Sequence, residues 1–399
     1  MFDIFVWVNP SLRLRVLTAD FASANQSLTL RVLTADQVAI CLRDCAWSDQ
    51  PQARGKFSMM NRMKPATLLI LILGSCSLWV KAQEKSPASS SSSTANPRLA
   101  PANLPGKGLR QHDFLYAGEG KEQRIYIVRK GAIVWSDANP DAKGEISDAV
   151  LMTNGNILFA HQFGVTMITR EKKVVWDYTA PPGAEIHTAQ PIGNDKVLFI
   201  QNGNPAVLRV VNITTGKTLT EFVLPVGNSE KVHPQFRHAR LTEAGTVLVA
   251  HLDMQKVVEY DVNGAAVWSY SIDGPWSAVR LKNGNTLIAT SKKLIREVDR
   301  QGTTVWELKP EDLPDYKISN FQIATRLANG NTLLNNWANI KPGADRADGP
   351  VQALEITSDK RVVWALRSWT DPADLGPATT IQILDRPAVP EKVRFGNIQ

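Results

Sequence analysis

The chain has 399 residues, of which 43% are hydrophobic and 21% charged, and its formal net charge is +7. Lys and Arg are scattered among Asp and Glu, so the modest positive charge predicts a mixed solvated surface and argues against a nucleic-acid partner. All three cysteines, Cys41, Cys45 and Cys76, precede the predicted linker, which excludes disulfides and thiolate metal sites from everything downstream.

The N-terminal part contains processing signals rather than a folded domain. Residues 1–58 include the heptad LRVLTAD twice, at 14–20 and 30–36, with no strand or helix period. We interpret this leader as translation from a misplaced start codon; a genuine cytoplasmic extension is the alternative. Residues 59–82 pass from basic to apolar to small residues, as a secretory signal peptide does. Cleavage after Ala82 competes with cleavage before Cys76, where LGSC resembles a lipobox and would give a lipid-tethered protein.

Residues 83–110 are rich in Ser, Pro and Ala, a composition typical of a flexible linker. The signal and the linker together predict an extracytoplasmic protein. It would be periplasmic, secreted or anchored by lipid to the envelope.

From residue 113 a pattern of four short strands recurs about every 40 to 50 residues. Its first two strands are joined by turns that read TNGN (153–156), GNDK (193–196), EAGT (243–246), KNGN (282–285) and ANGN (328–331). Its fourth strand contains one of the aromatic residues Trp135, Trp176, Phe222, Trp268, Trp306 and Trp364. This period predicts an all-β, six-bladed β-propeller of four-stranded antiparallel blades over residues 111–388, followed by a C-terminal tail, 389–399.

The first unit has only three strands before its tryptophan. Residues 378–384 (ATTIQIL) are the candidate for the fourth, because pairing this C-terminal strand with the N-terminal blade would close the ring and leave no open edge. A five-bladed ring with flanking strands is the main alternative. The Gly/Pro-containing insertion at 338–350 is predicted to be a loop on one face.

Two sets of residues are expected to pack the ring. The tryptophans are large enough to fill the wedges between blades. Small side chains suit the crowded axis, and the first strands place alanine at one equivalent position, in Ala149, Ala189, Ala239, Ala278 and Ala324.

Polar residues recur near the start of the first strand and the end of the second. Treating each turn as a two-residue type I′ hairpin predicts the pairs Asp148–His161, Thr188–Gln201, His238–His251, Ser277–Thr290 and Ile323–Asn336. The adjacent first-strand residues are Ser147, His187, Arg237, Trp276 and Gln322. Because these positions recur at one end of every blade, we expect a polar rim around a central ligand pocket. Hydrogen bonding to loops and buried water is the structural alternative.

The residue types at this rim indicate its chemistry. The candidate catalytic residues are His238, His187, His161 and Asp148, because a carboxylate can hold an imidazole in the tautomer that a general base or nucleophile needs. Arg237, Arg240 and Arg280 are candidates for binding an anion, and Trp276 for stacking on a ring or sugar. The remaining candidate ligand-binding residues are His251, Gln201, Gln322 and Asn336. No two of the rim histidines have a short ligand spacing, so no metal site is predicted.

The segments NGNTLI, NGNILF and VVWDY resemble the repeats of bacterial PQQ-like β-propellers, and more narrowly those of arylsulfotransferase-type six-bladed propellers. In the latter, a channel histidine takes the sulfuryl group from an aryl sulfate. RHARLTEAG at 237–245 is similar to a motif of that superfamily, which implies that His238 is that histidine and Arg240 the arginine of the motif. The aspartate that follows the histidine in the motif is missing here.

One further segment, NITTGKTLTEF at 212–222, is similar to the repeat signature of quinoprotein dehydrogenases but occurs once. No cofactor is predicted on this basis; PQQ and a metal ion are the alternatives.

No complete catalytic motif is present: the sequence has no G-x-S-x-G, P-loop or dinucleotide fingerprint. The favoured hypothesis is therefore a monomeric binding module that holds a small polar or anionic ligand in a His/Arg/Trp-lined axial pocket. The alternatives are a group-transfer enzyme, a sulfuryl transferase or hydrolase that uses His238 or His187, and a scaffold that binds other envelope proteins through its faces or the 338–350 insertion.

Overall fold

The computed structural model describes residues 112–120, 123–139, 144–338, 340, 349–370, 374–385 and 389–399, and the backbone of 14–20 and 29–35. The predicted signal peptide with Cys76, the linker and most of the 338–350 insertion lie outside the described residues. The chain divides into two compact units, Met1–Ala88 and Ser89–Gln399. Within the described residues, no helix is both long and apolar enough to span a bilayer.

In the first unit, the two copies of the duplicated heptad pair with each other. They form the antiparallel strands β1 (Leu14–Asp20) and β2 (Thr29–Ala35). The pattern of the sequence predicted no strands here. The two strands have nearly the same sequence, so each copy of the heptad serves as the antiparallel partner of the other.

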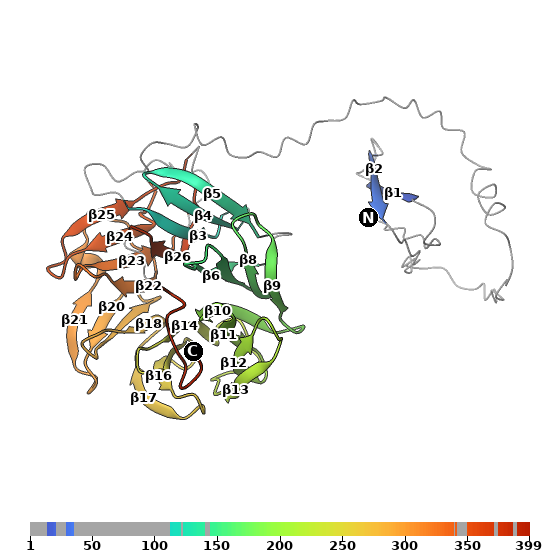
Figure 1. Cartoon of the computed structure of the whole chain (residues 1–399). Helices are drawn as coiled ribbons and strands as arrows, with labels where there is room; N and C mark the ends of the chain where they lie inside the picture. Colours follow the sequence, from blue (N-terminus) through green and yellow to red (C-terminus); the bar gives the residue numbers. More distant parts are fainter. Residues whose placement is uncertain are drawn as a thin grey trace, which may run out of the picture. The chain divides into compact units, whose positions relative to one another are not determined.

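The second unit is a ring of six four-stranded antiparallel blades (Figure 1). Blade 1 contains β26 (Ala378–Ile383), β3 (Phe114–Gly118), β4 (Arg124–Arg129) and β5 (Ala132–Ala138). Blade 2 contains β6 (Ile146–Leu151), β7 (Ile157–His161), β8 (Gly164–Ile168) and β9 (Val174–Thr179). Blade 3 contains β10 (Glu185–Ile192), β11 (Lys196–Asn202), β12 (Ala206–Asn212) and β13 (Thr218–Leu224).

Blade 4 contains β14 (Phe236–Leu241), β15 (Val247–His251), β16 (Lys256–Tyr260) and β17 (Ala266–Ser271). Blade 5 contains β18 (Pro275–Arg280), β19 (Thr286–Thr290), β20 (Ile295–Val298) and β21 (Thr304–Leu308), and the 3₁₀ turn η2 (Pro310–Asp312) follows it. Blade 6 contains β22 (Phe321–Arg326), β23 (Thr332–Asn336), β24 (Ala353–Ile356) and β25 (Val362–Leu366). The six-bladed prediction and the closure of blade 1 by the C-terminal strand are confirmed.

The turns between the first two strands of blades 2 to 6 are one residue longer than predicted. In blade 2, the Met152 amide donates to the Asn156 carbonyl (2.8 Å) and the Gly155 amide to the Met152 carbonyl (3.0 Å). This is a three-residue turn closed by Gly155 at a φ of +90°, a left-handed conformation that glycine adopts without steric cost. Near the turn, each first-strand residue therefore pairs with the residue one position earlier in the second strand than predicted.

Each innermost strand also has a bulge in its first half. The register shifts at Ser147 in β6, His187–Thr188 in β10, Arg237–His238 in β14, Trp276 in β18, Gln322–Ile323 in β22 and Thr379 in β26. A bulge leaves a residue unpaired and re-aims its side chain. Most of the predicted polar residues of the first strands lie at these bulges, outside the regular ladder, whereas Asp148 and Ser277 follow directly and pair with Ala160 and Ala289.

The predicted cross-strand pairs are wrong because the turn and the bulge each change the register. The second-strand residues instead lie opposite apolar or proline residues: Ile146↔His161, Ile186↔Gln201, Phe236↔His251, Pro275↔Thr290 and Phe321↔Asn336. By contrast, the five alanines do occupy one equivalent position. Each is buried, and each pairs with the residue ten positions further along the chain.

The tryptophans join neighbouring blades, as predicted. The Nε1 atoms of Trp135, Trp268 and Trp306 donate to carbonyls of Arg170, Arg300 and Ser358 in the next blade (2.8 to 2.9 Å). Arg280 of blade 5 lies over the Trp268 ring, 4.7 Å from its centroid, and pairs with Glu259 (2.5 Å). The interface between blades is therefore held by apolar contacts of the tryptophans and by hydrogen bonds and ion pairs.

The C-terminal segment is packed against the ring. In the turn of blade 2, Thr153 donates to the Glu391 side chain, and in the turn of blade 3, the Gly193 amide donates to the Glu391 carbonyl (2.9 Å). The Gly396 amide donates to the carbonyl of Gly245 in blade 4 (2.7 Å). Phe395 is fully buried in an apolar cluster with side chains of blades 3 and 4. Residues 389–399, expected to be a tail, thus join three blades on the face that carries the short hairpin turns (Figure 1).

Candidate functional site

Asp148 and Arg240 meet at the ring axis from different blades. The guanidinium donates to both carboxylate oxygens, Nη1 to Oδ2 at 2.8 Å and Nη2 to Oδ1 at 2.9 Å. The Thr188 hydroxyl, from the blade between them, donates to Oδ2 as well (3.1 Å). Burial alone would raise the pKa of Asp148, but Arg240 and His238 hold it well below its usual range. The carboxylate is therefore ionised, and its charge is matched by Arg240.

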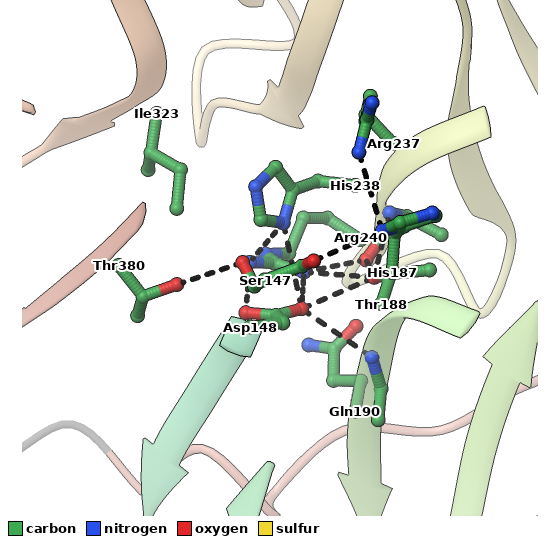
Figure 2. Close-up of polar contacts among 12 residues, drawn as sticks. Ser147, Asp148, His187, Thr188, Gln190, Arg237, His238, Arg240, Ile323 and Thr380 are labelled. Carbon is green, nitrogen blue, oxygen red and sulfur yellow. Dashed lines mark hydrogen bonds and ion pairs between the residues drawn. The ribbon is translucent and has the colours of Figure 1, made fainter. Parts of the chain in front are cut away.

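His238 lies beside this pair, as Figure 2 shows. Its Nδ1 is 3.3 Å from Nη2 of Arg240 and 3.5 Å from Oδ2 of Asp148. The first contact needs a lone pair on Nδ1 and the second a proton, so one tautomer makes only one of them. Burial lowers the pKa of His238, against the opposing pull of Asp148, and the ring is thus neutral near pH 7.

A cavity of about 650 Å³ extends from the Asp148–Arg240 pair toward the face that carries the short hairpin turns. Asp148 and Arg240 line it, and aliphatic side chains form much of its wall, among them Val150, Pro191, Val279, Ile323, Leu327 and Ile381. Its other polar lining residues are His112, Gln190, Thr325, Arg326, Asn329, Thr380, Gln382 and Asp385. Pro390 of the C-terminal segment completes the lining. The cavity wall is mostly apolar, and its charged lining groups are the Asp148–Arg240 pair, the His112–Asp385 pair (2.6 Å) and Arg326.

Several of these polar groups already have structural partners. The Oε1 atom of Gln190 accepts from the Leu241 amide (2.8 Å) and that of Gln382 from the Leu151 amide (2.8 Å). Each amide side chain thereby joins two innermost strands that share no backbone ladder. Arg326 pairs with Glu297 (2.6 Å).

A second polar cluster lies at the opposite end of the innermost strands, where longer loops such as 225–235 and 309–320 connect the blades. We call it the rim cluster and define it as Glu145, Glu185, His187, His233 and Arg237, with Glu119 beside it. Arg237 lies over the Trp276 ring, 4.6 Å from its centroid. The predicted residues His187, Arg237 and Trp276 therefore do come together, from three blades.

The carboxylates of the rim cluster were not predicted from the sequence. Glu145 accepts from Arg237 (2.8 Å), and Glu185 contacts Nε2 of His187 (2.9 Å) and Nδ1 of His233 (2.7 Å). His187 and His233 lower the pKa of Glu185 against the effect of burial. Burial, with Glu145 nearby, raises the pKa of Glu119 to about 7. Glu145 and Glu185 lie just before the bulges of blades 2 and 3, a position that could have identified them.

Six predicted site residues lie away from both places. Four of them bond to side chains of the same blade or of a neighbouring blade: His161 to Thr166, His251 to Tyr260, Gln201 to Tyr178, and Arg280 to Glu259. Asn336 holds the backbone of loops around Lys317 and Val351. The physical reason is the same for the second-strand residues among them. They lie one strand further from the axis, where their side chains find partners in their own blade, in the neighbouring blade or in the loops. Gln322 is buried in the bulge of β22.

His251 shows the consequence for chemistry. It is completely buried, stacked edge to face on Phe236 with ring centroids 4.7 Å apart. Burial and nearby Lys256 lower its pKa to about 3. The ring is a neutral core residue rather than a ligand for an anion.

The cavity does not fit pyrroloquinoline quinone. That molecule carries three carboxylates, which require cationic groups to pair with. Among the described residues that line the cavity, both guanidinium groups are already matched, Arg240 by Asp148 and Arg326 by Glu297. No step is therefore assigned to this cofactor.

Comparisons with known proteins agree with the fold. A family model described as outer membrane protein assembly factor BamB matches residues 207–351. No curated protein matches the chain in sequence. A solved protein of unknown function from Bacteroides caccae is 26% identical, with a TM-score of 0.61, and the match covers 69% of this chain and 100% of that one.

Two more distant structures also match parts of the chain. Virginiamycin B lyase from Staphylococcus aureus is 14% identical with a TM-score of 0.44, covering 65% of this chain and 87% of that one. BamB from Moraxella catarrhalis is 14% identical with a TM-score of 0.37, covering 58% and 66%.

Proposed function

We propose that this chain, a six-bladed propeller of the bacterial PQQ-like repeat type, binds a small, neutral organic molecule in its axial cavity. The main support is the cavity itself, about 650 Å³ in volume with a largely aliphatic wall. This volume is in the range of small-molecule sites, which combine apolar walls with a few placed polar groups.

The charges favour a neutral ligand over the anion expected from the sequence. Arg240 is fully paired with Asp148, and Arg326 with Glu297, so neither guanidinium is available without breaking a buried ion pair. Breaking such a pair costs about 3 to 5 kcal/mol. A neutral ligand with a hydroxyl or carbonyl at one end could hydrogen-bond the pair without separating it.

The test is a thermal-shift and native mass-spectrometry screen of neutral and anionic compounds against two tryptophan variants. Val279→Trp would place an indole ring at the cavity wall and narrow the space for a ligand, whereas Val267→Trp changes a residue that is 54% exposed and does not line the cavity. We expect neutral hits that bind the wild type and Val267→Trp but not Val279→Trp. Hits that survive Val279→Trp, or a screen without hits, would refute the proposal.

A second candidate function is group transfer at His238. The observation that favours it is the position of Asp148, whose Oδ2 lies 3.5 Å from Nδ1 of His238. This carboxylate, from another blade, could supply the partner that the missing aspartate of the motif would provide, and could leave Nε2 as a nucleophile. Turnover of an aryl sulfate or ester that disappears in a folded His238→Ala variant would support this function; an inactive wild type would exclude it for the substrates tried.

We also infer an extracytoplasmic location. The matching family model is described by a role in outer membrane protein assembly, and residues 59–82 have the pattern of a signal peptide. A scaffold role in the envelope follows from the same description as an alternative to ligand binding. Mass spectrometry of the mature N-terminus tests the location: a start at Gln83, or a lipidated Cys76, is expected, and an unprocessed chain would refute it.

A further inference from the structure

The rim cluster places two imidazoles and a carboxylate within reach of one point. One ligand atom each of Glu145, His187 and His233 lies within 4.8 Å of the other two. The rings of His187 and His233 are 5.0 Å apart and almost perpendicular. Ligand atoms around a tetrahedral zinc ion are ~3.3 Å apart, given bonds of ~2.0 to 2.1 Å. His233 lies on a loop with its side chain 48% exposed, so side-chain rotation can close the difference.

Glu185 fixes the tautomers in the required sense. It is within hydrogen-bonding distance of Nε2 of His187 (2.9 Å) and Nδ1 of His233 (2.7 Å), and an ionised carboxylate accepts a hydrogen bond from an N–H at each position. The lone pairs then reside on Nδ1 of His187 and Nε2 of His233. A carboxylate that orients ligating histidines in this way is the usual outer shell of a metal site.

The inner atoms of the cluster lie close enough together to share a cation. With its proton on Nε2, His187 directs the lone pair of Nδ1 toward Oε1 of Glu145, which is 2.8 Å away, and the Ser147 hydroxyl lies 2.9 Å from Nδ1 and 3.0 Å from Oε1. Arg237 bridges the two here, 2.8 Å from Glu145 and 3.2 Å from Nδ1 of His187. Glu119 is a second carboxylate that acts on this guanidinium, and Glu185 contacts the other nitrogen of the His187 ring. With both imidazoles neutral, two or more ionised carboxylates in this cluster carry more negative charge than Arg237 matches, and a divalent cation would neutralise the surplus.

We propose that the rim binds a first-row divalent metal ion of the Zn²⁺ type through Nδ1 of His187, Nε2 of His233 and the Glu145 carboxylate. Imidazole with carboxylate is a donor set that such ions favour. Glu185 orients the two histidines, and Arg237 withdraws from Glu145 while it stays stacked on Trp276. Three protein ligands leave a coordination position open toward the long-loop face. This site is separate from the axial cavity and does not depend on its ligand.

The experiment titrates Zn²⁺ into the full chain, without a histidine tag, by isothermal calorimetry, with Co²⁺ absorption as a second readout. We expect one ion per chain at the rim and binding at least ~10-fold weaker in His233→Ala and in Glu145→Gln, since even outer-shell substitutions cost 10- to 100-fold. Glu230→Gln, an exposed carboxylate on the loop of His233, is the matched control and should bind as the wild type does.

A variant with the opposite sign distinguishes the site from general destabilisation. Arg237→Met keeps an apolar stem on Trp276 but removes the competing cation, so it should bind Zn²⁺ more tightly than the wild type. Weaker or unchanged binding in Arg237→Met would overturn the proposal. So would a wild type that binds no Zn²⁺, or binding that persists in His233→Ala, as expected if the N-terminal cysteines were the ligands.

Discussion

Replacing Arg240 by Met tests how strongly the ring axis depends on its ion pair. The substitution removes both donors of the bidentate contact with Asp148, whose side chain is only 5% exposed. Leaving a buried charge without its partner costs about 3 to 5 kcal/mol. Thr188 still donates to the carboxylate, and the Ala189 amide lies 3.4 Å from it, so we expect the lower end of this range.

The cost should depend on pH in a defined direction. In the wild type, the lowered pKa of Asp148 adds stability above the unfolded pKa, ~3.9, and this stability is lost as pH falls through the folded value. Without Arg240, burial raises the pKa of Asp148, so the variant regains stability when the carboxyl takes up a proton. The difference from the wild type should therefore be largest at pH 7 and shrink as pH falls toward ~4.

The assay is urea unfolding followed by tryptophan fluorescence at both pH values, for Arg240→Met, Asp148→Asn and the double variant. Because the double variant has no unpaired charge, it should recover about 2 kcal/mol relative to the sum of the single variants. If Arg240→Met lowered the free energy of unfolding by less than about 1 kcal/mol at pH 7, and the effects of the two single variants simply added in the double variant, the two residues would not meet at the axis.

Three further predictions concern the packing around the site. His251, with a pKa of about 3, should cost the wild type stability as pH falls from ~6.5 toward that value, and His251→Leu should flatten this part of the pH–stability curve; an unchanged slope would argue against its burial. Trp268→Ala should lower the free energy of unfolding by ~2 kcal/mol or more through its contacts with the next blade, whereas Val267→Ala, at an exposed position, should stay within ~0.5 kcal/mol; equal effects would contradict the wedge between blades. Phe395→Ala should cost ~3 to 5 kcal/mol and lower the melting temperature, and a neutral effect would show that the C-terminal segment is not part of the core.

The blade count and closure could be predicted because they depend on local signals. Three features constrain the fold independently: the glycine-containing turns, the aromatic residue in each fourth strand, and the missing strand of the first blade. Few strand arrangements other than a closed six-bladed ring agree with all three. The alanines of the innermost strands could be placed for the same reason, since their distance from the turn is the same in each blade.

The site was harder to predict because it depends on register. A turn of three residues instead of two moved every pair by one, and the bulge at residues such as Ser147 and Trp276 moved the rest again. His161 and His251 were assigned to the polar rim for a different reason: both lie at the ends of second strands, one strand further from the axis. His238, Arg240 and Asp148 lie together, as expected. That Arg240 forms an ion pair with Asp148 could not be predicted, because the sequence shows which residues lie at one end of the ring but not which of them bond to each other.

The central claim is that distant strands bring Asp148, His238 and Arg240 together around one hollow. An X-ray structure of the chain measures this most directly. It should show the Arg240 guanidinium in bidentate contact with Asp148 near 2.8 to 2.9 Å, His238 beside them, and an open cavity below. Side chains directed separately into solvent, or buried in unconnected interfaces between blades, would contradict the account.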